Sequence, residues 1–150
     1  MPSRWIPVRS RPRKSALKRG KRPRRRSVRG EEEKALDAML REYVMRRDQN
    51  RCRRCGKEPR KGRGQALETA HILPKGKYPS LRYVTDNVLA LCHACHHGFA
   101  HKDPLGMTLW LSETLGEEHL KRLQHYRVTP GKVDRAWDRV RLEQLLRDSP

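Results

Sequence analysis

The chain has 150 residues, of which 36 are lysine or arginine and 17 are acidic, so its formal net charge is +19. This length predicts one compact domain with tails, and one Phe, three Trp and four Tyr are too few for a large core. A small core usually needs a staple such as a metal ion. The charge favours a polyanionic partner, nucleic acid first, over a membrane surface, because no basic amphipathic helix with a clean apolar face is apparent.

The first 30 residues are the most basic segment. They contain 13 lysine or arginine residues, no acid and four prolines, a composition that predicts a disordered basic arm over 1–30. The remaining 120 residues carry 23 basic side chains (36 minus 13) and 17 acidic ones, a net charge of +6. The arm is suited to contact phosphates, and a solubilising tail or a localisation signal is the alternative.

Downstream of the arm, apolar spacing and chain breakers predict an α+β domain. A first helix opens at Glu31 and ends between 47 and 50, with apolar positions from Leu36 to Val44 at intervals of three and four. The later elements are predicted as short strands at 68–73 and 88–91, an extended stretch at 81–84, a turn at 85–87, and helices at 93–103, 105–115, 117–126 and 133–147. We expect a core domain over 31–104 and a C-terminal helical extension over 105–150.

The four cysteines occur as two C-x-x-C pairs, Cys52 with Cys55 and Cys92 with Cys95. Two residues between the sulfurs let both reach one tetrahedral ion, so the pairs predict one structural zinc. No apolar h-region opens the chain, which favours thiols on a metal in a reducing cytoplasm over a disulfide framework. A redox-active dithiol is the alternative, but the alternation of strands and helices which that fold requires is missing from the pattern.

Three polar residues stand at marked places in this frame. His71 lies on the first predicted strand, Asn87 precedes the second strand, and His96 directly follows the second cysteine pair. A lone histidine is more often a surface or core residue, but two strands and a helix pinned by zinc are expected to bring His71 and His96 face to face. The histidines that we expect to have no role in the site are His93, His119 and His125.

Taken together, these segments resemble the HNH endonuclease family in its four-cysteine, phage-type form. The resemblance covers residues 36–101 and is carried by CRRCG at 52–56, ETAHI at 68–72 and DNVLALCHACH at 86–96. It implies a small zinc-stapled ββα-metal core flanked by helices. It also implies metal-dependent hydrolysis of DNA phosphodiester bonds, leaving nicks or double-strand breaks.

The resemblance also implies roles for single residues. His71 would be the general base, Asn87 would hold the loop that orients it, and His96 would bind a catalytic divalent cation. His101 is the candidate for a further ligand, and His97, four residues before His101, is the competitor. Ala70 stands where many members carry an Asp or His metal ligand, so a labile Mg²⁺ or Mn²⁺ is expected, with Ni²⁺ or Zn²⁺ as alternatives.

Basic side chains around these motifs are expected to contact DNA phosphates rather than bases. They are Arg53, Arg54, Lys75, Lys77 and Arg82. A homodimer would allow both strands to be cut, and a phage protein is a further candidate partner in a bacterial cytoplasm. The rival interpretation is a non-catalytic zinc-knuckle protein that binds DNA or RNA, and a third is a nuclease acting on branched DNA.

Overall fold

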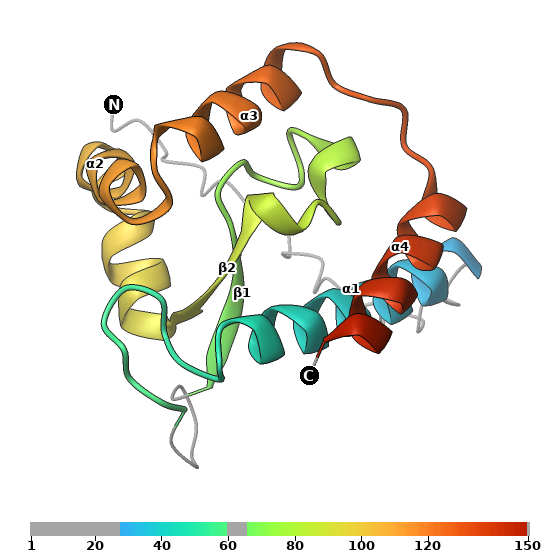
Figure 1. Cartoon of the computed structure of the whole chain (residues 1–150), viewed down its shortest axis with the longest axis horizontal. Helices are drawn as coiled ribbons and strands as arrows, with labels where there is room; N and C mark the ends of the chain where they lie inside the picture. Colours follow the sequence, from blue (N-terminus) through green and yellow to red (C-terminus); the bar gives the residue numbers. More distant parts are fainter. Residues whose placement is uncertain (1–27, 60–65, 150) are drawn as a thin grey trace, which may run out of the picture.

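The computed structural model describes residues 28–59 and 66–149, and a two-stranded sheet lies at its centre with helices around it (Figure 1). β1 (Leu67–His71) pairs antiparallel with β2 (Val88–Cys92), so that Leu67 lies opposite Cys92 and His71 opposite Val88. The α+β class predicted from the sequence is confirmed. Both strands are found where they were predicted, although β1 runs over 67–71 rather than 68–73.

Strand β2 forms the middle of the core. Four consecutive side chains from Val88 to Leu91 are each no more than 3% exposed. A strand that is buried on both faces reads as a continuous apolar run, as this one does. Helix α1 (Val28–Arg47) contacts the sheet, as does η3 (Ala94–Ala100), against which α2 (Pro104–Leu115) packs.

Helix α1 buries one stripe. Leu36, Leu40 and Val44, spaced by four residues, are each at most 1% exposed. The helix lies beside α4 (Arg135–Asp148), whose Leu142 joins the same core (Figure 1). It starts at Val28, three residues earlier than predicted and inside the predicted basic arm, while the rest of that arm, 1–27, lies outside the described residues.

The segment between the strands differs from the prediction of an extended stretch at 81–84. It forms two short 3₁₀ turns, Pro79–Leu81 and Thr85–Asn87, and the second confirms the turn predicted at 85–87. The tight turns bury Leu81 at 3% and Tyr83 at 1% exposure. Periodicity could not show this, because the Tyr83 hydroxyl is held by the carbonyl of Glu33 on α1, at 3.1 Å.

The helix after the second cysteine pair is wide. In η3 the backbone N–H of His101 donates to the carbonyl of His96, 3.2 Å away and five residues earlier, which is π-helical geometry. Helix α2 then begins at Pro104 and ends at Leu115, and Gly116, with a φ of 80°, is its C-cap as predicted. Helix α3 (Glu117–Val128) follows directly. Among the described helices, none has the length and apolarity needed to cross a membrane.

Candidate active site

The four cysteines converge on one point. Cys52 and Cys55 come from the loop after α1, and Cys92 and Cys95 from the end of β2 and the start of η3. Their sulfurs lie within 4.8 Å of one another. Gly56, with a φ of 70°, allows the turn in which its N–H donates to the Cys52 carbonyl at 2.8 Å. Four sulfur donors at this spacing could hold a structural zinc.

The electrostatics of the thiols fit such an ion. Burial raises the pKa of Cys52, but hydrogen bonds from surrounding backbone N–H groups outweigh it and lower that pKa to about 7. Burial and the neighbouring thiols raise the pKa of Cys95 to about 12, although Arg54 Nη1 lies 3.8 Å from its sulfur. Four thiolates repel one another without a cation, and a divalent ion removes that conflict.

His71 is the last residue of β1, and its ring is anchored through one nitrogen. Nε2 lies 2.9 Å from the backbone carbonyl of Arg82, which can only accept, so Nε2 carries the proton. In the neutral ring Nδ1 is then the acceptor. Burial lowers the pKa of His71 below 6.5, helped by Lys75, while the Arg82 carbonyl and Asp37 act in the opposite direction.

Asn87 is fully buried and ties together the segments on both sides of this histidine. Its Oδ1 accepts the N–H of Leu73 at 2.7 Å, and its Nδ2 donates to the carbonyls of Leu73 at 3.0 Å and Leu81 at 3.1 Å. Its own carbonyl accepts the N–H of Ile72 at 2.8 Å. The chain leaving His71 and the chain approaching Arg82 are therefore fixed by one side chain.

Glu68, which the sequence did not single out, is the centre of a histidine cluster. Its Oε2 lies 2.6 Å from His96 Nδ1 and 2.9 Å from His97 Nε2, and its Oε1 lies 3.0 Å from His93 Nδ1. Burial raises the pKa of Glu68, but these histidines lower it to about 2, so the carboxylate stays ionised. His93 therefore has a hydrogen-bond partner in this cluster, while the expectation that it has no role in the site stays a prediction.

Strand geometry explains why Glu68 reaches the histidines. Side chains alternate between the two faces of a strand, so Glu68 projects to the same side of β1 as Ala70. That side faces η3. In the sequence, the signal for Glu68 is its place two residues before Ala70 on the same strand. This signal points to the site only once Ala70 is known to face η3.

Three histidines, two in η3 and one at its C-cap, form a second group of possible metal ligands. His96, His97 and His101 each offer a ring nitrogen, and these atoms lie within 4.8 Å of one another. The rings of His96 and His101 have centroids 4.8 Å apart. Residues five apart point to different sides of an α-helix, and the wide turn of η3 brings them to the same side.

The base and the cation candidates flank β1. Alternation places His71 on the other side from Glu68, and three residues of strand separate them by roughly 10 Å. Within the described residues His71 and His96 share no hydrogen bond or ring contact. The face-to-face arrangement expected for these two histidines therefore stays a prediction, with the end of β1 between them.

Two of the five cations expected at DNA have partners inside the protein. The Arg82 guanidinium is bound by Asp37 and Glu33 and its side chain is 19% exposed, while its expected contact with DNA stays a prediction. Arg54 lies over the Phe99 ring, 3.5 Å from its centroid, and its Nη1 lies 3.8 Å from the sulfur of Cys95 in the cysteine cluster. Arg53 stays near the surface at 41% exposure, and Lys75 and Lys77 are also exposed.

His119, expected to be solvated, instead supports the turn that precedes Asn87. Its Nε2 lies 2.7 Å from the carbonyl of Asp86, and the neighbouring Arg122 lies 3.4 Å from the Asp86 carboxylate. This contact brings α3 against the segment between the strands. The expectation failed because the partner lies 33 residues earlier in the chain.

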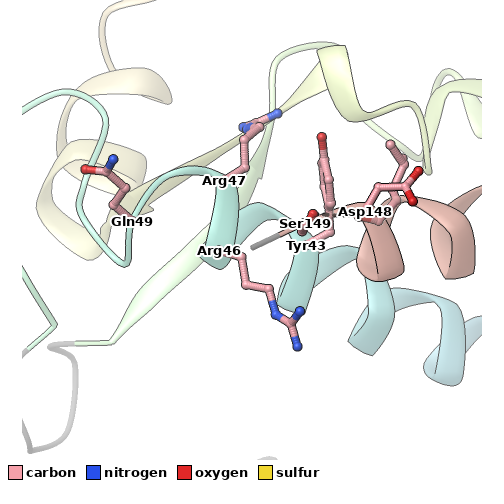
Figure 2. Close-up of a pocket in the computed structure, with 7 residues that line it drawn as sticks. Tyr43, Arg46, Arg47, Gln49, Asp148 and Ser149 are labelled. Atoms are coloured by element: carbon pink, nitrogen blue, oxygen red, sulfur yellow. Dashed lines mark hydrogen bonds between the residues drawn. The ribbon is translucent and has the colours of Figure 1, made fainter.

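A pocket of about 410 Å³ lies between the ends of α1 and α4, lined by Tyr43, Arg46, Arg47 and residues of the C-terminus (Figure 2). Arg46 is paired with Glu42 at 2.5 Å. Arg47 donates to Asp48 and to the carbonyls of Thr85 and Val88. Both cations are therefore bound by groups of the protein itself. The residues that line the pocket include none of the histidine cluster, so the two places are separate.

Comparison with known proteins identifies the central segment. Residues 52–98 match the family model described as HNH endonuclease. The match includes both cysteine pairs, both strands and the first part of η3. No curated protein and no solved structure matches the chain.

Proposed function

We propose that the protein is a metal-dependent endonuclease that hydrolyses phosphodiester bonds in DNA, a proposal supported by the match of residues 52–98 to the HNH endonuclease family model. The observation that carries the proposal is the hydrogen bond from His71 Nε2 to the Arg82 carbonyl at 2.9 Å. It fixes the tautomer of a neutral imidazole and leaves Nδ1 free to accept a proton. A lowered pKa keeps this base neutral at physiological pH.

In this mechanism His71 Nδ1 removes a proton from water as the water oxygen attacks phosphorus. The phosphodiester bond to the leaving oxygen then breaks, and that oxygen takes a proton from solvent. Asn87 keeps the chain on both sides of His71 in place through its three side-chain hydrogen bonds. A divalent cation, when bound, neutralises charge on the phosphate and on the leaving oxygen.

The cation is assigned to the histidines of η3. His96 would be the first ligand, with His101 and His97 beside it, and the Glu68 carboxylate either binds the ion or orients His96 through Nδ1. Glu68 thereby takes over the place of the acid that is missing at Ala70. A site of imidazoles with one carboxylate favours Mn²⁺, Ni²⁺ or Zn²⁺ over Mg²⁺, which prefers oxygen ligands.

The remainder of the chain would hold DNA. Arg53, Lys75 and Lys77 are exposed cations beside the knuckle and the His71 loop, and they suit phosphate contacts. The arm at 1–30 would add affinity that depends on salt. In this division residues 31–104 carry the nuclease and 105–150 support it, and a homodimer or a phage protein partner would supply the second cut.

A plasmid-nicking assay tests the proposal. Wild-type protein and His71→Ala are compared after chelation and re-addition of Mg²⁺, Mn²⁺, Ni²⁺ or Zn²⁺, with His125→Ala, an exposed histidine of α3, as the matched control. We expect cleavage by the wild type and by the His125 variant, and none by His71→Ala.

Binding without cleavage under every metal would refute the nuclease. It would favour the rival function, a zinc-knuckle protein that binds DNA or RNA. Comparison of a four-way junction with a linear duplex separates a branched-DNA nuclease from a general one, because equal rates remove the reason to invoke branched DNA.

A further inference from the structure

We propose that Arg82 is a positioning residue for His71, held by two acids of helix α1 that lies outside the matched nuclease segment; this inference rests on the proposed function of His71. The carbonyl that accepts the proton of His71 Nε2 belongs to Arg82 itself. Whatever fixes the backbone of Arg82 therefore fixes the orientation of the base. The contacts of the Arg82 side chain show what does so.

The Arg82 guanidinium is held by three hydrogen bonds. Nε and Nη2 donate to the two carboxylate oxygens of Asp37 at 3.0 and 2.6 Å, and Nη1 donates to Glu33 Oε2 at 3.0 Å. This forked geometry sets the plane of the guanidinium as well as its position. Arg82 is thereby anchored at both ends, at its guanidinium by α1 and at its carbonyl by His71.

The next residue adds a second anchor to the same turn of α1. The Tyr83 hydroxyl donates to the carbonyl of Glu33 at 3.1 Å, and its ring is 1% exposed. The guanidinium of Arg135, on α4, lies 4.8 Å from the centroid of that ring. Two consecutive residues are thus clamped between α1 and α4, which restricts how far the Arg82 carbonyl can move.

The two acids that bind Arg82 lie close together on helix α1. Glu33 and Asp37 are four residues apart, so they share one face of α1, where like charges repel. Arg82 neutralises both of them. Burial raises the pKa of Asp37, but the Arg82 hydrogen bond and charge lower it overall, so the acid stays ionised.

Asp37→Asn tests the inference because it keeps the shape and removes the charge. Its matched control is Glu42→Gln on the same helix, where the acid pairs with Arg46 at the surface, 2.5 Å away. Zinc content and the thermal midpoint establish that each variant is folded. Long-range ¹⁵N NMR of the His71 ring and the kinetic constants for plasmid cleavage are then measured.

In the wild type and in Glu42→Gln, His71 should show one neutral tautomer, with the proton on Nε2. In Asp37→Asn we expect a mixture of tautomers and a fall in kcat of about tenfold with KM unchanged, since a displaced base slows chemistry and not DNA binding. Asp37→Glu, which restores the charge, should recover most of both. If the Asp37–Arg82 ion pair only stabilised the fold, Asp37→Asn would lower the thermal midpoint and leave the His71 tautomer unchanged.

A single Nε2–H tautomer and wild-type kcat in a folded Asp37→Asn would overturn the inference. If Asp37→Asn does not fold, Arg82→Lys replaces it, because lysine keeps a positive charge but loses the fork. If the wild type does not cleave DNA with any metal, the proposed function fails. The tautomers of wild type and variant then still decide whether Arg82 positions His71.

Discussion

Replacement of Asn87 tests the link between the two strands most directly. The side chain is 0% exposed, and its amide makes three hydrogen bonds to backbone groups of two segments. Asn87→Ala removes two N–H donors, one from the Leu73 carbonyl and one from the Leu81 carbonyl, and one acceptor from the Leu73 N–H. These backbone groups lie in the interior or close to it, so water replaces the amide poorly.

The magnitude follows from the three hydrogen bonds that disappear. At about 1 kcal/mol each, their loss lowers the free energy of unfolding by about 3 kcal/mol. For a domain near this size, 1 kcal/mol corresponds to roughly 2–4 °C, so the thermal midpoint should fall by roughly 6–12 °C. The cleavage rate should fall as well, because Asn87 fixes the chain that leaves His71 and the chain that approaches Arg82.

Asn87→Asp is the informative companion variant. It keeps an acceptor for the Leu73 N–H but turns a second oxygen toward two carbonyls, so at neutral pH it should be at least as unstable as Asn87→Ala. Gln144→Ala, an exposed amide of α4, is the control and should stay within about 0.5 kcal/mol of wild type. Calorimetry and denaturant unfolding measure all three. A loss below about 1 kcal/mol in Asn87→Ala would refute this account of the hydrogen bonds.

Three further outcomes are expected. The purified protein should hold one tightly bound zinc, and Cys95→Ala should lose it together with the folded knuckle; mass spectrometry with plasma ionisation and circular dichroism check this, and a zinc-free wild type would contradict it. The cleavage rate should rise with pH through a pKa below 6.5, because burial lowers the pKa of His71 and only the neutral ring accepts a proton; a rate that levels off only well above pH 7 would count against His71 as the base. Glu68→Gln should weaken binding of Mn²⁺ or Ni²⁺ by about tenfold or more without changing zinc content, measured by calorimetric titration of zinc-loaded protein; equal affinities would remove Glu68 from the cation site.

Local patterns were sufficient for the framework of the fold. Cysteines paired with two residues between them need no long-range knowledge to be recognised as candidate ligands, and an apolar run as short as Val88 to Leu91 is typical of a buried strand. Gly116 stops a helix because it accepts a φ of 80°. Each of these signals lies within a few residues of the feature it predicts.

The missed features all depend on partners far away in the chain. Glu68 finds His93 and His96, 25 and 28 residues later, so no local pattern marks it. Arg82, predicted to meet DNA, is bound by Asp37, 45 residues earlier. A basic residue in a basic protein looks like a phosphate contact until the fold shows which acid lies next to it.

The wide turn of η3 makes chain length part of the cation site. Removal of one residue between His97 and His101 would place His96 and His101 four apart, a spacing that puts both on one side of an ordinary α-helix, so the pair would stay together without the wide turn. Insertion of one residue there would place them six apart and rotate His101 away from His96, so that the nitrogens that now lie within 4.8 Å would separate. In this helix an insertion that spares every ligand would therefore damage the site as a ligand substitution does, and a protein engineer should count residues there as carefully as identities.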